Sequence, residues 1–400
     1  MTNKNLEVFF WIIVGIVFYS YIGYGILLIF LVLIKEVVYY FIPKKKALLN
    51  SNYQPEVTLF VAAYNEIENI ENKVRNSFSL DYPKNKVKHI WITDGSNDGS
   101  PELLKTYDNI EVYHEDKRAG KINAMKRGMQ FVKTPIVIFS DGNTILSHET
   151  IKEIVKAFED IDVGCVSGEK KIYQKNKDVA SSAGEGFYWK YESFLKKLDS
   201  KLYSTVGAAG ELFAIRTSLF EEVEQDTLLD DFVISLRIAK KGYKIKYCPK
   251  AYASETASIN IKEELKRKVR IASGAFQTFF RDFDILNPFK TKILSFQYFS
   301  HKVMRWIFVP LSLLFLFPTN LYLVNKNGFD YYNVYTYFME FQLLIYLIAI
   351  VGWILENQKI RIKLLFIPYY IIFMNFAMFL GFFKYLRKTQ SVNWERAKRA

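Results

Sequence analysis

The chain is poor in cysteine, with only Cys165 and Cys248 among 400 residues. Two cysteines without a CxxC pair exclude a disulfide framework and a thiolate zinc site, and they predict core residues in a reducing compartment. The glycine-rich sequences GxGxxG and GxxxxGK[ST] are also missing. Their absence argues against a dinucleotide-dependent oxidoreductase and against a phosphate-loop NTPase.

Acidic residues are outnumbered, because 54 Lys and Arg face 41 Asp and Glu and give a formal net charge of +13. A basic balance is typical of proteins that bind nucleic acid. Here, however, the basic residues cluster beside apolar segments, where they would meet the anionic head groups of membrane lipids. We therefore expect membrane lipids, and no nucleic acid, as partners.

Long apolar runs occupy both ends of the chain. The run Leu6–Ile34 contains a single charged residue, Glu7, over a length that crosses a hydrocarbon core of about 30 Å. It is too long for a cleaved signal peptide, and no small-residue cleavage site follows it. Beyond Asn287, three further runs approach the length of a membrane span: Val303–Leu323, Tyr335–Leu355 and Leu364–Phe383.

These runs divide the chain into five expected segments. They are an N-terminal transmembrane helix (1–45), a soluble domain (46–284), an interfacial amphipathic segment (285–301), about three C-terminal transmembrane helices (302–385) and a basic tail (386–400). The basic stretch Pro43–Lys46 favours a cytoplasmic soluble domain. With a cytoplasmic domain, one span before it and three after it place the tail outside the cell. The basic residues of the tail, however, favour the cytoplasm. The alternatives to four full spans are therefore one re-entrant segment or a first segment folded as a hairpin.

Acidic residues follow the ends of several predicted strands in the soluble domain. Strand-like runs alternate with helical spacing, which predicts an α/β sheet. Glu66, Asp94 and Asp141 stand one to three residues after the ends of three of these strands. The four runs are Val57–Ala63, Val87–Thr93, Ile110–His114 and Ile136–Phe139.

If the strands are parallel, their carboxyl ends meet at one edge of the sheet and these carboxylates converge on a crevice. The purely structural alternative for Asp141-Gly142-Asn143 is an Asx turn. Several carboxylates without a phosphate-binding glycine loop suit nucleoside hydroxyls and a hard divalent cation, which takes oxygen ligands. The sequence therefore predicts a nucleotide diphosphate bound through a metal ion.

Six motifs, in order, resemble those of family 2 glycosyltransferases with the GT-A fold. They are AAYNE, TDGSNDGS, RAGKINAM, FSDGNT, GAAGELFAIR and LLDDFVISLRIAKKGYK. The resemblance covers nearly the whole of the soluble domain and extends to membrane-bound bacterial polysaccharide glycosyltransferases. It implies an inverting transfer of a sugar from a nucleotide sugar, usually a UDP-sugar, with Mg²⁺ or Mn²⁺, by a cytoplasmic domain anchored in the inner membrane.

The resemblance also implies roles on the donor side. Glu66 and Asp94 match positions that hold uracil and ribose, and Lys121 matches a lysine near the donor phosphates. A solvated lysine at a helix start is the alternative for Lys121. Asp141 matches the first acid of the DxD motif, and Asn143 replaces the second acid. The predicted metal ligands are therefore Asp141 and Asn143, and this metal site has one negative charge fewer than a site with the full DxD motif.

On the acceptor side, the resemblance makes Asp231 the general base and Asp230 the acid before it. Capping of the following helix by these two acids is the alternative. Gly210 ends the small-residue stretch Gly207–Gly210, which permits close approach of a sugar or, alternatively, only tight packing.

Two arginines complete the predicted acceptor side. Processive synthases carry the sequence QxxRW at the comparable place, where the tryptophan stacks beneath the acceptor sugar. This chain has Arg267-x-x-Arg270-Ile271, so the glutamine and the tryptophan are missing. We expect Arg267 and Arg270 to contact the acceptor or a diphosphate, with lipid head groups as the alternative.

The sequence thus predicts a membrane-bound inverting glycosyltransferase that extends a lipid-linked or membrane-associated saccharide in surface glycan synthesis. A processive polysaccharide synthase whose helices form a channel is the alternative among enzymes. A non-catalytic nucleotide-sugar sensor is the alternative of another class, although a sensor has no use for the predicted base Asp231.

Overall fold

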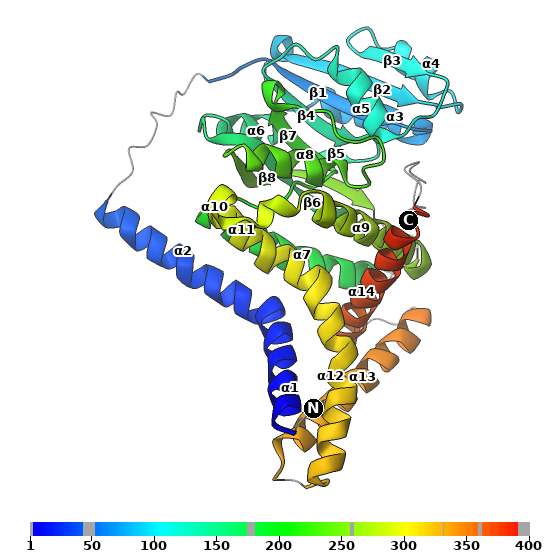
Figure 1. Cartoon of the computed structure of the whole chain (residues 1–400). Helices are drawn as coiled ribbons and strands as arrows, with labels where there is room; N and C mark the ends of the chain where they lie inside the picture. The colour runs from blue at the N-terminus through cyan, green and yellow to red at the C-terminus, as the bar shows by residue number, and fades with distance from the viewer. Residues whose placement is uncertain are drawn as a thin grey trace.

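A computed structural model describes residues 3–42, 53–173, 181–256, 260–330, 332–358 and 362–390. A layered α/β domain lies at one end of the molecule, and the apolar helices extend from it toward the opposite end (Figure 1). The basic stretch Pro43–Lys46 and residues 391–400 of the predicted tail lie outside the described residues.

The described residues of the domain form one eight-stranded sheet with the order β3-β2-β1-β4-β7-β6-β8-β5. Strands β1 to β4 run parallel to one another where they pair, whereas β7 runs antiparallel to β4. The carboxyl ends of β1, β2 and β4 therefore share one edge with the beginning of β7. The strands are β1 (Val57–Ala63), β2 (Val87–Asp94), β3 (Glu111–Glu115), β4 (Ile136–Asp141), β5 (Ile145–Leu146), β6 (Val163–Tyr173), β7 (Leu212–Arg216) and β8 (Lys244–Thr256).

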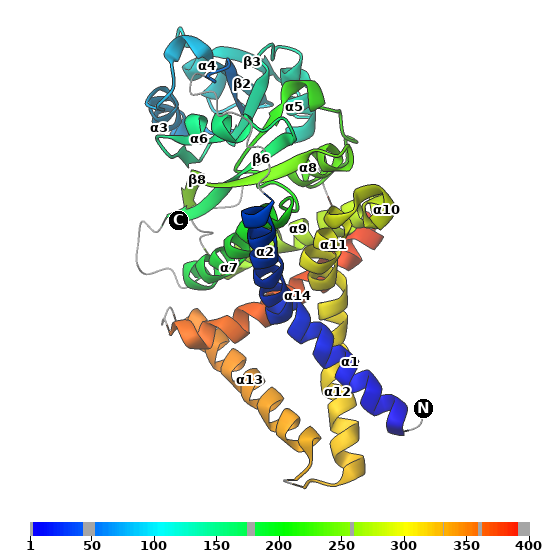
Figure 2. The same cartoon turned by 90° about the vertical axis from the view of Figure 1, so that its left-hand side faces the viewer.

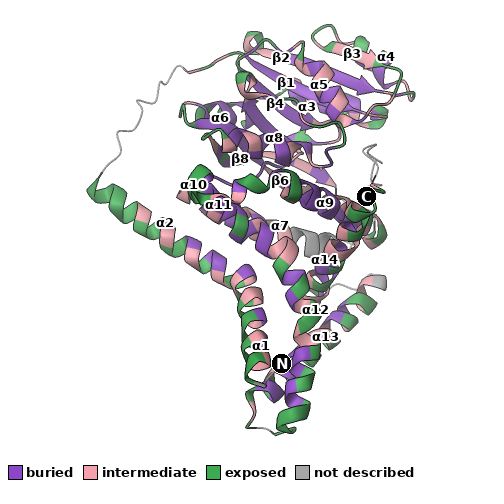
Figure 3. Cartoon of the chain, viewed as in Figure 1, coloured by how far each residue is buried: buried purple, intermediate pink, exposed green. Residues whose placement is uncertain are grey.

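Helices cover both faces of the sheet, as the continuous burial of β1 requires. Leu59 and its neighbours on one face pack with α3 and α6, whereas Phe60 on the other face packs with α5 and α8. Figure 3 shows this buried centre against the more exposed apolar helices. The domain helices are α3 (Ile67–Phe78), α4 (Ser100–Lys105), α5 (Lys121–Met129), α6 (Thr150–Ala157), α7 (Ser181–Leu202), α8 (Asp230–Lys240) and α9 (Ile261–Arg281).

The predicted α/β class is confirmed. Helix α8 begins at Asp230, inside the motif LLDDFVISLRIAKKGYK. The capping position is occupied by Leu229, which makes no side-chain cap, and not by Asp230 or Asp231. Both acids instead stand in the first helical turn, where a negative charge is favoured by the helix dipole.

Four helical runs are long and apolar enough to cross a membrane: Lys4–Phe41, Ile293–Asn327, Val334–Glu356 and Leu365–Leu386. The first run joins α1 (Asn3–Phe18), the π-helical turn η1 (Tyr19–Gly23) and α2 (Tyr24–Phe41) into one bent helix, so it is not a hairpin. Its second half lies against the domain, where the Tyr24 hydroxyl donates to Asp199 Oδ1 of α7 at 2.5 Å.

The second run begins at Ile293, before the predicted start at Val303. It contains α11 (Ile293–Tyr298), the π-helix η5 (Phe299–Phe308) and α12 (Val309–Asn327). The predicted interfacial segment 285–301 therefore merges into this run at its end. Its beginning includes the short helix α10 (Pro288–Thr291), in which Phe289 is 92% exposed.

The last helices differ in their direction. Helices α12 and α13 (Val334–Asn357) point away from the domain, whereas α14 (Lys363–Leu386) lies beneath it (Figure 2). Helix α14 packs along α9: the rings of Phe276 and Phe382 are 5.0 Å apart, and those of Phe280 and Tyr385 stack at 5.5 Å. A Cβ on Gly381 would lie 2.3 Å from Ala272, so this contact requires glycine.

Candidate active site

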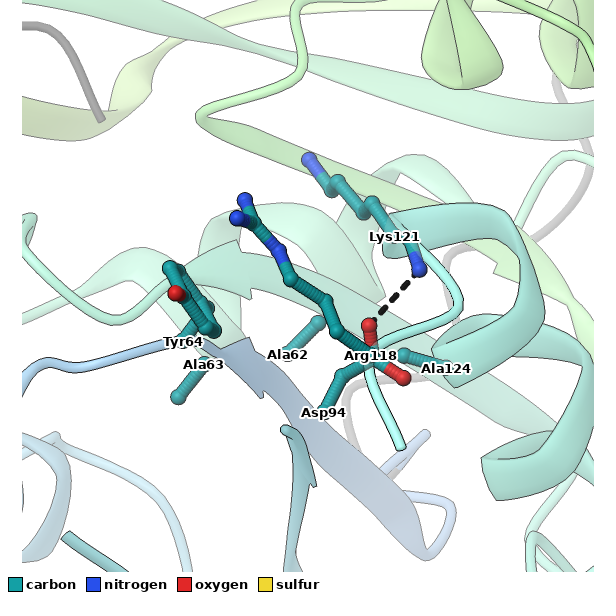
Figure 4. Close-up of a pocket in the computed structure, with 8 residues that line it drawn as sticks. Ala62, Ala63, Tyr64, Asp94, Arg118, Lys121 and Ala124 are labelled. Atoms are coloured by element: carbon teal, nitrogen blue, oxygen red, sulfur yellow. Dashed lines mark hydrogen bonds between the residues drawn. The ribbon is translucent and has the colours of Figure 1, made fainter. Parts of the chain in front are cut away.

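A pocket opens at the carboxyl ends of β1 and β2, beside the start of α5 (Figure 4). Two of the residues that line this pocket form a cation–π contact, because the Arg118 guanidinium lies 3.6 Å from the centre of the Tyr64 ring. Its lining residues are Ala62, Ala63, Tyr64, Asp94, Arg118, Gly120, Lys121 and Ala124.

Asp94 fixes the loop that carries Arg118. Its carboxylate accepts the backbone N–H groups of Ala119 at 3.1 Å and Gly120 at 2.7 Å. Gly95 adopts a φ of +71°, and a Cβ there would lie 2.6 Å from the side chain of Arg118. Asp94 therefore lies in the pocket predicted for the nucleoside, and part of its hydrogen-bonding capacity holds the loop in place.

Glu66 is placed differently from Asp94. It is 1% exposed, accepts a hydrogen bond from the Asn69 side chain at 2.5 Å and does not line the pocket. A Cβ on Gly142 would lie 3.4 Å from Glu66 Cγ. The Glu66 side chain thus lies against the Asp141-Gly142-Asn143 turn.

Lys121 joins the predicted donor and acceptor sides. Its ammonium lies 3.0 Å from Asp141 Oδ1 and 3.5 Å from Asp230 Oδ2. Burial lowers the pKa of Lys121, but the carboxylates of Asp141 and Asp230 and a third from Asp231 outweigh burial and raise it above its ordinary value. Lys121, the first residue of α5, is therefore paired with carboxylates inside the pocket and is not a solvated lysine.

Asp231 lies on the other side of this cluster, in the first turn of α8. A Cβ on Gly210 would lie 3.3 Å from the Asp231 carboxylate, a tight contact that glycine avoids. Burial first, and then the charge of Asp230, raise the pKa of Asp231 to about 7. A carboxyl group with a pKa near neutrality suits proton transfer at cellular pH.

The turn after β4 offers oxygen atoms to a cation. The Oδ1 atom of Asn143 is buried and has no hydrogen-bond partner among the described residues. Together with the Asp141 carboxylate it supplies the hard oxygen ligands that Mg²⁺ and Mn²⁺ take. The described residues contain no group of three or more His, Cys, Asp or Glu that could hold a metal. The residues fit a cation whose remaining ligands come from a diphosphate and water.

The two arginines of α9 have different surroundings. Arg267 donates to Glu264 one turn earlier, with Nε–Oε2 at 3.1 Å. Arg270 is near the acidic cluster: burial lowers its pKa, while the charges of Asp230, Asp231 and Asp141 counteract this. Arg270 Nε is buried without a hydrogen-bond partner in the described part of the chain. Arg270 is thus the better placed of the two to meet a negatively charged ligand.

Two groups of interacting side chains near the site were not predicted from the sequence. Tyr64 and Arg118 occur in the motifs AAYNE and RAGKINAM, but nothing in the sequence indicates that their side chains contact each other. Lys170 of β6 is fully buried between Glu211 and Glu255, with Nζ 2.5 Å from Glu211 Oε1. Burial raises the pKa of Glu211, but Lys170 outweighs burial and holds it below its ordinary value.

The mixed sheet and its helices resemble the GT-A fold. A similar fold occurs in a mannosyltransferase of Pyrobaculum calidifontis in complex with GDP-mannose and Mn²⁺, with a TM-score of 0.62 and 20% identity over 92% of this chain and 99% of that one. The sequence profile of glycosyl transferase family 2 matches residues 58–224. Over these residues the chain is similar to the glycosyltransferases of family 2, and it carries four helical runs long and apolar enough to cross a membrane.

Curated relatives with a named activity also match the chain. Poly-beta-1,6-N-acetyl-D-glucosamine synthase of Staphylococcus aureus (strain COL) is 28% identical over 282 residues, which are 67% of this chain. The match spans 66% of that relative's length. The same enzyme of Staphylococcus epidermidis is 25% identical over 315 residues, which are 74% of this chain and 73% of that one.

Proposed function

We propose that this glycosyltransferase moves a sugar with inversion from a UDP-sugar to a lipid-linked or membrane-associated saccharide in surface glycan synthesis. The observation that carries the proposal is the Asp231 carboxyl group, which has a pKa of about 7 and lies directly against Gly210. The names of the staphylococcal relatives make N-acetylglucosamine the first sugar to consider.

The donor is proposed to bind along the sheet edge. The nucleobase lies on the stack of Tyr64 and Arg118, where an aromatic or guanidinium face supports a planar ring. The diphosphate then extends toward Lys121 and Asp141, which are 3.0 Å apart. Mg²⁺ or Mn²⁺ held by Asp141 and Asn143 would supply neutralisation of the diphosphate charge as it leaves.

The chain's own residues then perform the proton transfer. Asp231 takes the proton of the acceptor hydroxyl while that oxygen forms its bond to the anomeric carbon and the bond to the diphosphate breaks. Attack from the face opposite the leaving group inverts the anomeric carbon. Lys121 stabilises the negative charge that grows on the leaving diphosphate, and the buried Arg270 guanidinium adds positive charge nearby.

The test of this proposal is UDP release from the full-length protein in detergent or lipid. We expect a membrane saccharide acceptor plus one UDP-sugar of a panel, with Mn²⁺ present, to give UDP release well above that of protein without acceptor. A protein that binds nucleotide sugars but releases no UDP with any acceptor would be a sensor. That result would contradict the proposed transfer.

A processive synthase is the second candidate, because the curated relatives carry that name. The chain places Ile271, 37% exposed, where processive synthases carry a tryptophan. An aromatic platform contributes about 0.5–1.5 kcal/mol beyond area burial, and its loss weakens the hold on an extended acceptor between transfers.

We therefore expect one sugar, or very few, per binding event. Excess radiolabelled donor should give short products that appear on all acceptors together when sized by gel or mass spectrometry. The variant Ile271→Trp should lengthen them, and Phe289→Trp, on the exposed α10, is the matched control. High-molecular-weight product from the parent, while most acceptor remains unused, would favour the synthase.

We also propose that the catalytic domain is cytoplasmic and that α1, α12 and α13 cross the membrane while α14 stays on the cytoplasmic side. Support comes from the packing of α14 along α9, a helix of the catalytic domain. Three crossings leave the end of α14, with its basic residues Lys384, Arg387 and Lys388, on the side that basic residues favour. This arrangement removes the conflict between the number of spans and the charge of the tail.

Single cysteines test this topology, because both native cysteines are buried. A membrane-impermeant maleimide added to intact cells should label Asp330→Cys, between α12 and α13. Lys105→Cys of the domain and Thr389→Cys after α14 should react only once the membrane is opened. Labelling of Thr389→Cys in intact cells, together with Asp330→Cys, would show that α14 crosses.

A further inference from the structure

Lys73 of α3 is a lysine whose whole side chain lies inside the domain, with an exposure of 0%. Its ammonium donates to Ser140 Oγ at 2.7 Å, to the Thr144 carbonyl at 2.9 Å and to Thr144 Oγ1 at 3.1 Å. The three protons of the ammonium thus meet three uncharged oxygen atoms. None of the ion pairs among the described residues involves this lysine.

The oxygen atoms that Lys73 binds stand at the two ends of one turn. Ser140 precedes Asp141, and Thr144 follows Asn143. The Thr144 hydroxyl also lies 2.9 Å from the Asp141 carbonyl and 3.1 Å from Ser140 Oγ. Lys73 therefore hydrogen-bonds both ends of the turn, and Asp141 and Asn143 form the tip of the turn between them.

Stability alone does not account for an ammonium in this place. A buried charge with only neutral partners is unfavourable, and an apolar side chain of similar length would be buried at lower cost. Burial lowers the pKa of Lys73 to about 7, and the negative charge of Asp141 counteracts that effect. The carboxylate at the tip of the turn thus favours the charged form of Lys73.

We propose that Lys73 is a positioning residue for the cation site, which holds the turn so that Asp141 and Asn143 Oδ1 face the same divalent ion. The inference rests on the proposed function, because it assumes that a nucleotide diphosphate and a cation bind at this turn. Groups that orient metal ligands typically change metal affinity when they are removed, without touching the metal themselves.

Mn²⁺ binding by electron paramagnetic resonance, in the presence of UDP and with the full-length protein, tests this role. Lys73→Met should weaken Mn²⁺ binding by about tenfold to a hundredfold, whereas a cooperative thermal transition without ligand should show that the variant remains folded. Ser77→Ala is the matched control, since Ser77 is buried one turn further along α3 and hydrogen-bonds the Lys73 carbonyl at 2.8 Å. It should leave Mn²⁺ affinity within twofold of the parent, roughly as expected for a site remote from the turn.

Thr144→Val provides a second measurement if Lys73→Met does not fold. It removes one acceptor of Lys73 and keeps the shape of the side chain, so Mn²⁺ binding should again weaken. Parental Mn²⁺ affinity in either folded variant would overturn the role of Lys73 and leave the proposed function standing. Absence of Mn²⁺ and UDP binding by the parent itself would instead overturn the proposed cation site, and this inference with it.

Discussion

Asp231→Asn should lower the rate of sugar transfer by about 10²-fold or more while donor binding survives. The amide keeps the shape of the carboxyl group beside Gly210 and cannot take the proton of the acceptor hydroxyl. Steady-state UDP release and calorimetric binding of the UDP-sugar separate the two effects. Asp162→Asn, an exposed carboxylate paired with Lys244, is the matched control and should transfer sugar at the parental rate.

The pH profile of the same reaction gives an independent check. Burial, and then Asp230, raise the pKa of Asp231 to about 7, and the base works only when it is deprotonated. The parental rate should therefore rise with pH through about 7 and level off above it. A variant Asp231→Asn with turnover within a few-fold of the parent, and the same profile, would place the base elsewhere.

The raised pKa also has a consequence for stability. The folded state binds the Asp231 proton more tightly than the unfolded chain does, whose value is 3.8. Below that pH both states are protonated and nothing is lost. As pH rises from 3.8 to about 7 the unfolded state ionises first, so stability falls and then stays constant above that window. Asp231→Asn should therefore raise the thermal unfolding midpoint more at pH 8 than at pH 4.

Removal of divalent cations should weaken donor binding and catalysis together, and Asp141→Ala should do the same. A cation on a leaving diphosphate contributes several kcal/mol, and a loss of about 10²-fold or more in transfer follows. Calorimetry of UDP-sugar binding and UDP release, each with chelator and with added Mn²⁺, measure the two effects.

Asn143→Asp is the matched variant for this prediction. It restores the second acid of the DxD motif, and the extra negative charge should tighten Mn²⁺ binding while the turn keeps its shape. Full transfer by the parent in chelator would remove the cation from the proposed reaction. The ammonium of Lys121, 3.0 Å from Asp141 Oδ1, would then be the positive charge nearest to that carboxylate.

Much of the catalytic domain was readable from the sequence, because its signals are local. Strand β1 has its predicted bounds, since a fully apolar run depends on neighbouring residues alone. The convergence of Asp94 and Asp141 also followed, because parallel strands bring their carboxyl ends to one edge. The roles given to these residues stay predictions.

Contacts between distant residues could not be predicted in this way. The motifs gave no reason to place Lys121 within reach of Asp230, which is 109 residues away, or to set Arg118 against the Tyr64 ring. Nor did they distinguish Arg267, held by Glu264, from Arg270, whose charge reaches the acidic cluster. Such distinctions depend on where a folded chain brings each side chain, and a pattern along the sequence does not contain that information.

By itself, the sequence determined which segments must be buried and which strand ends carry charge, because composition sets the free energy of leaving water. It did not determine what covers each apolar surface. Helix α14 has the composition of a membrane span, yet its packing against α9 comes from the fit of Gly381 to Ala272 and of Phe382 to Phe276. Likewise, only the tertiary structure decided that Lys73 lies beneath the Asp141 turn, because close packing, and not hydrophobicity, selects which surfaces meet.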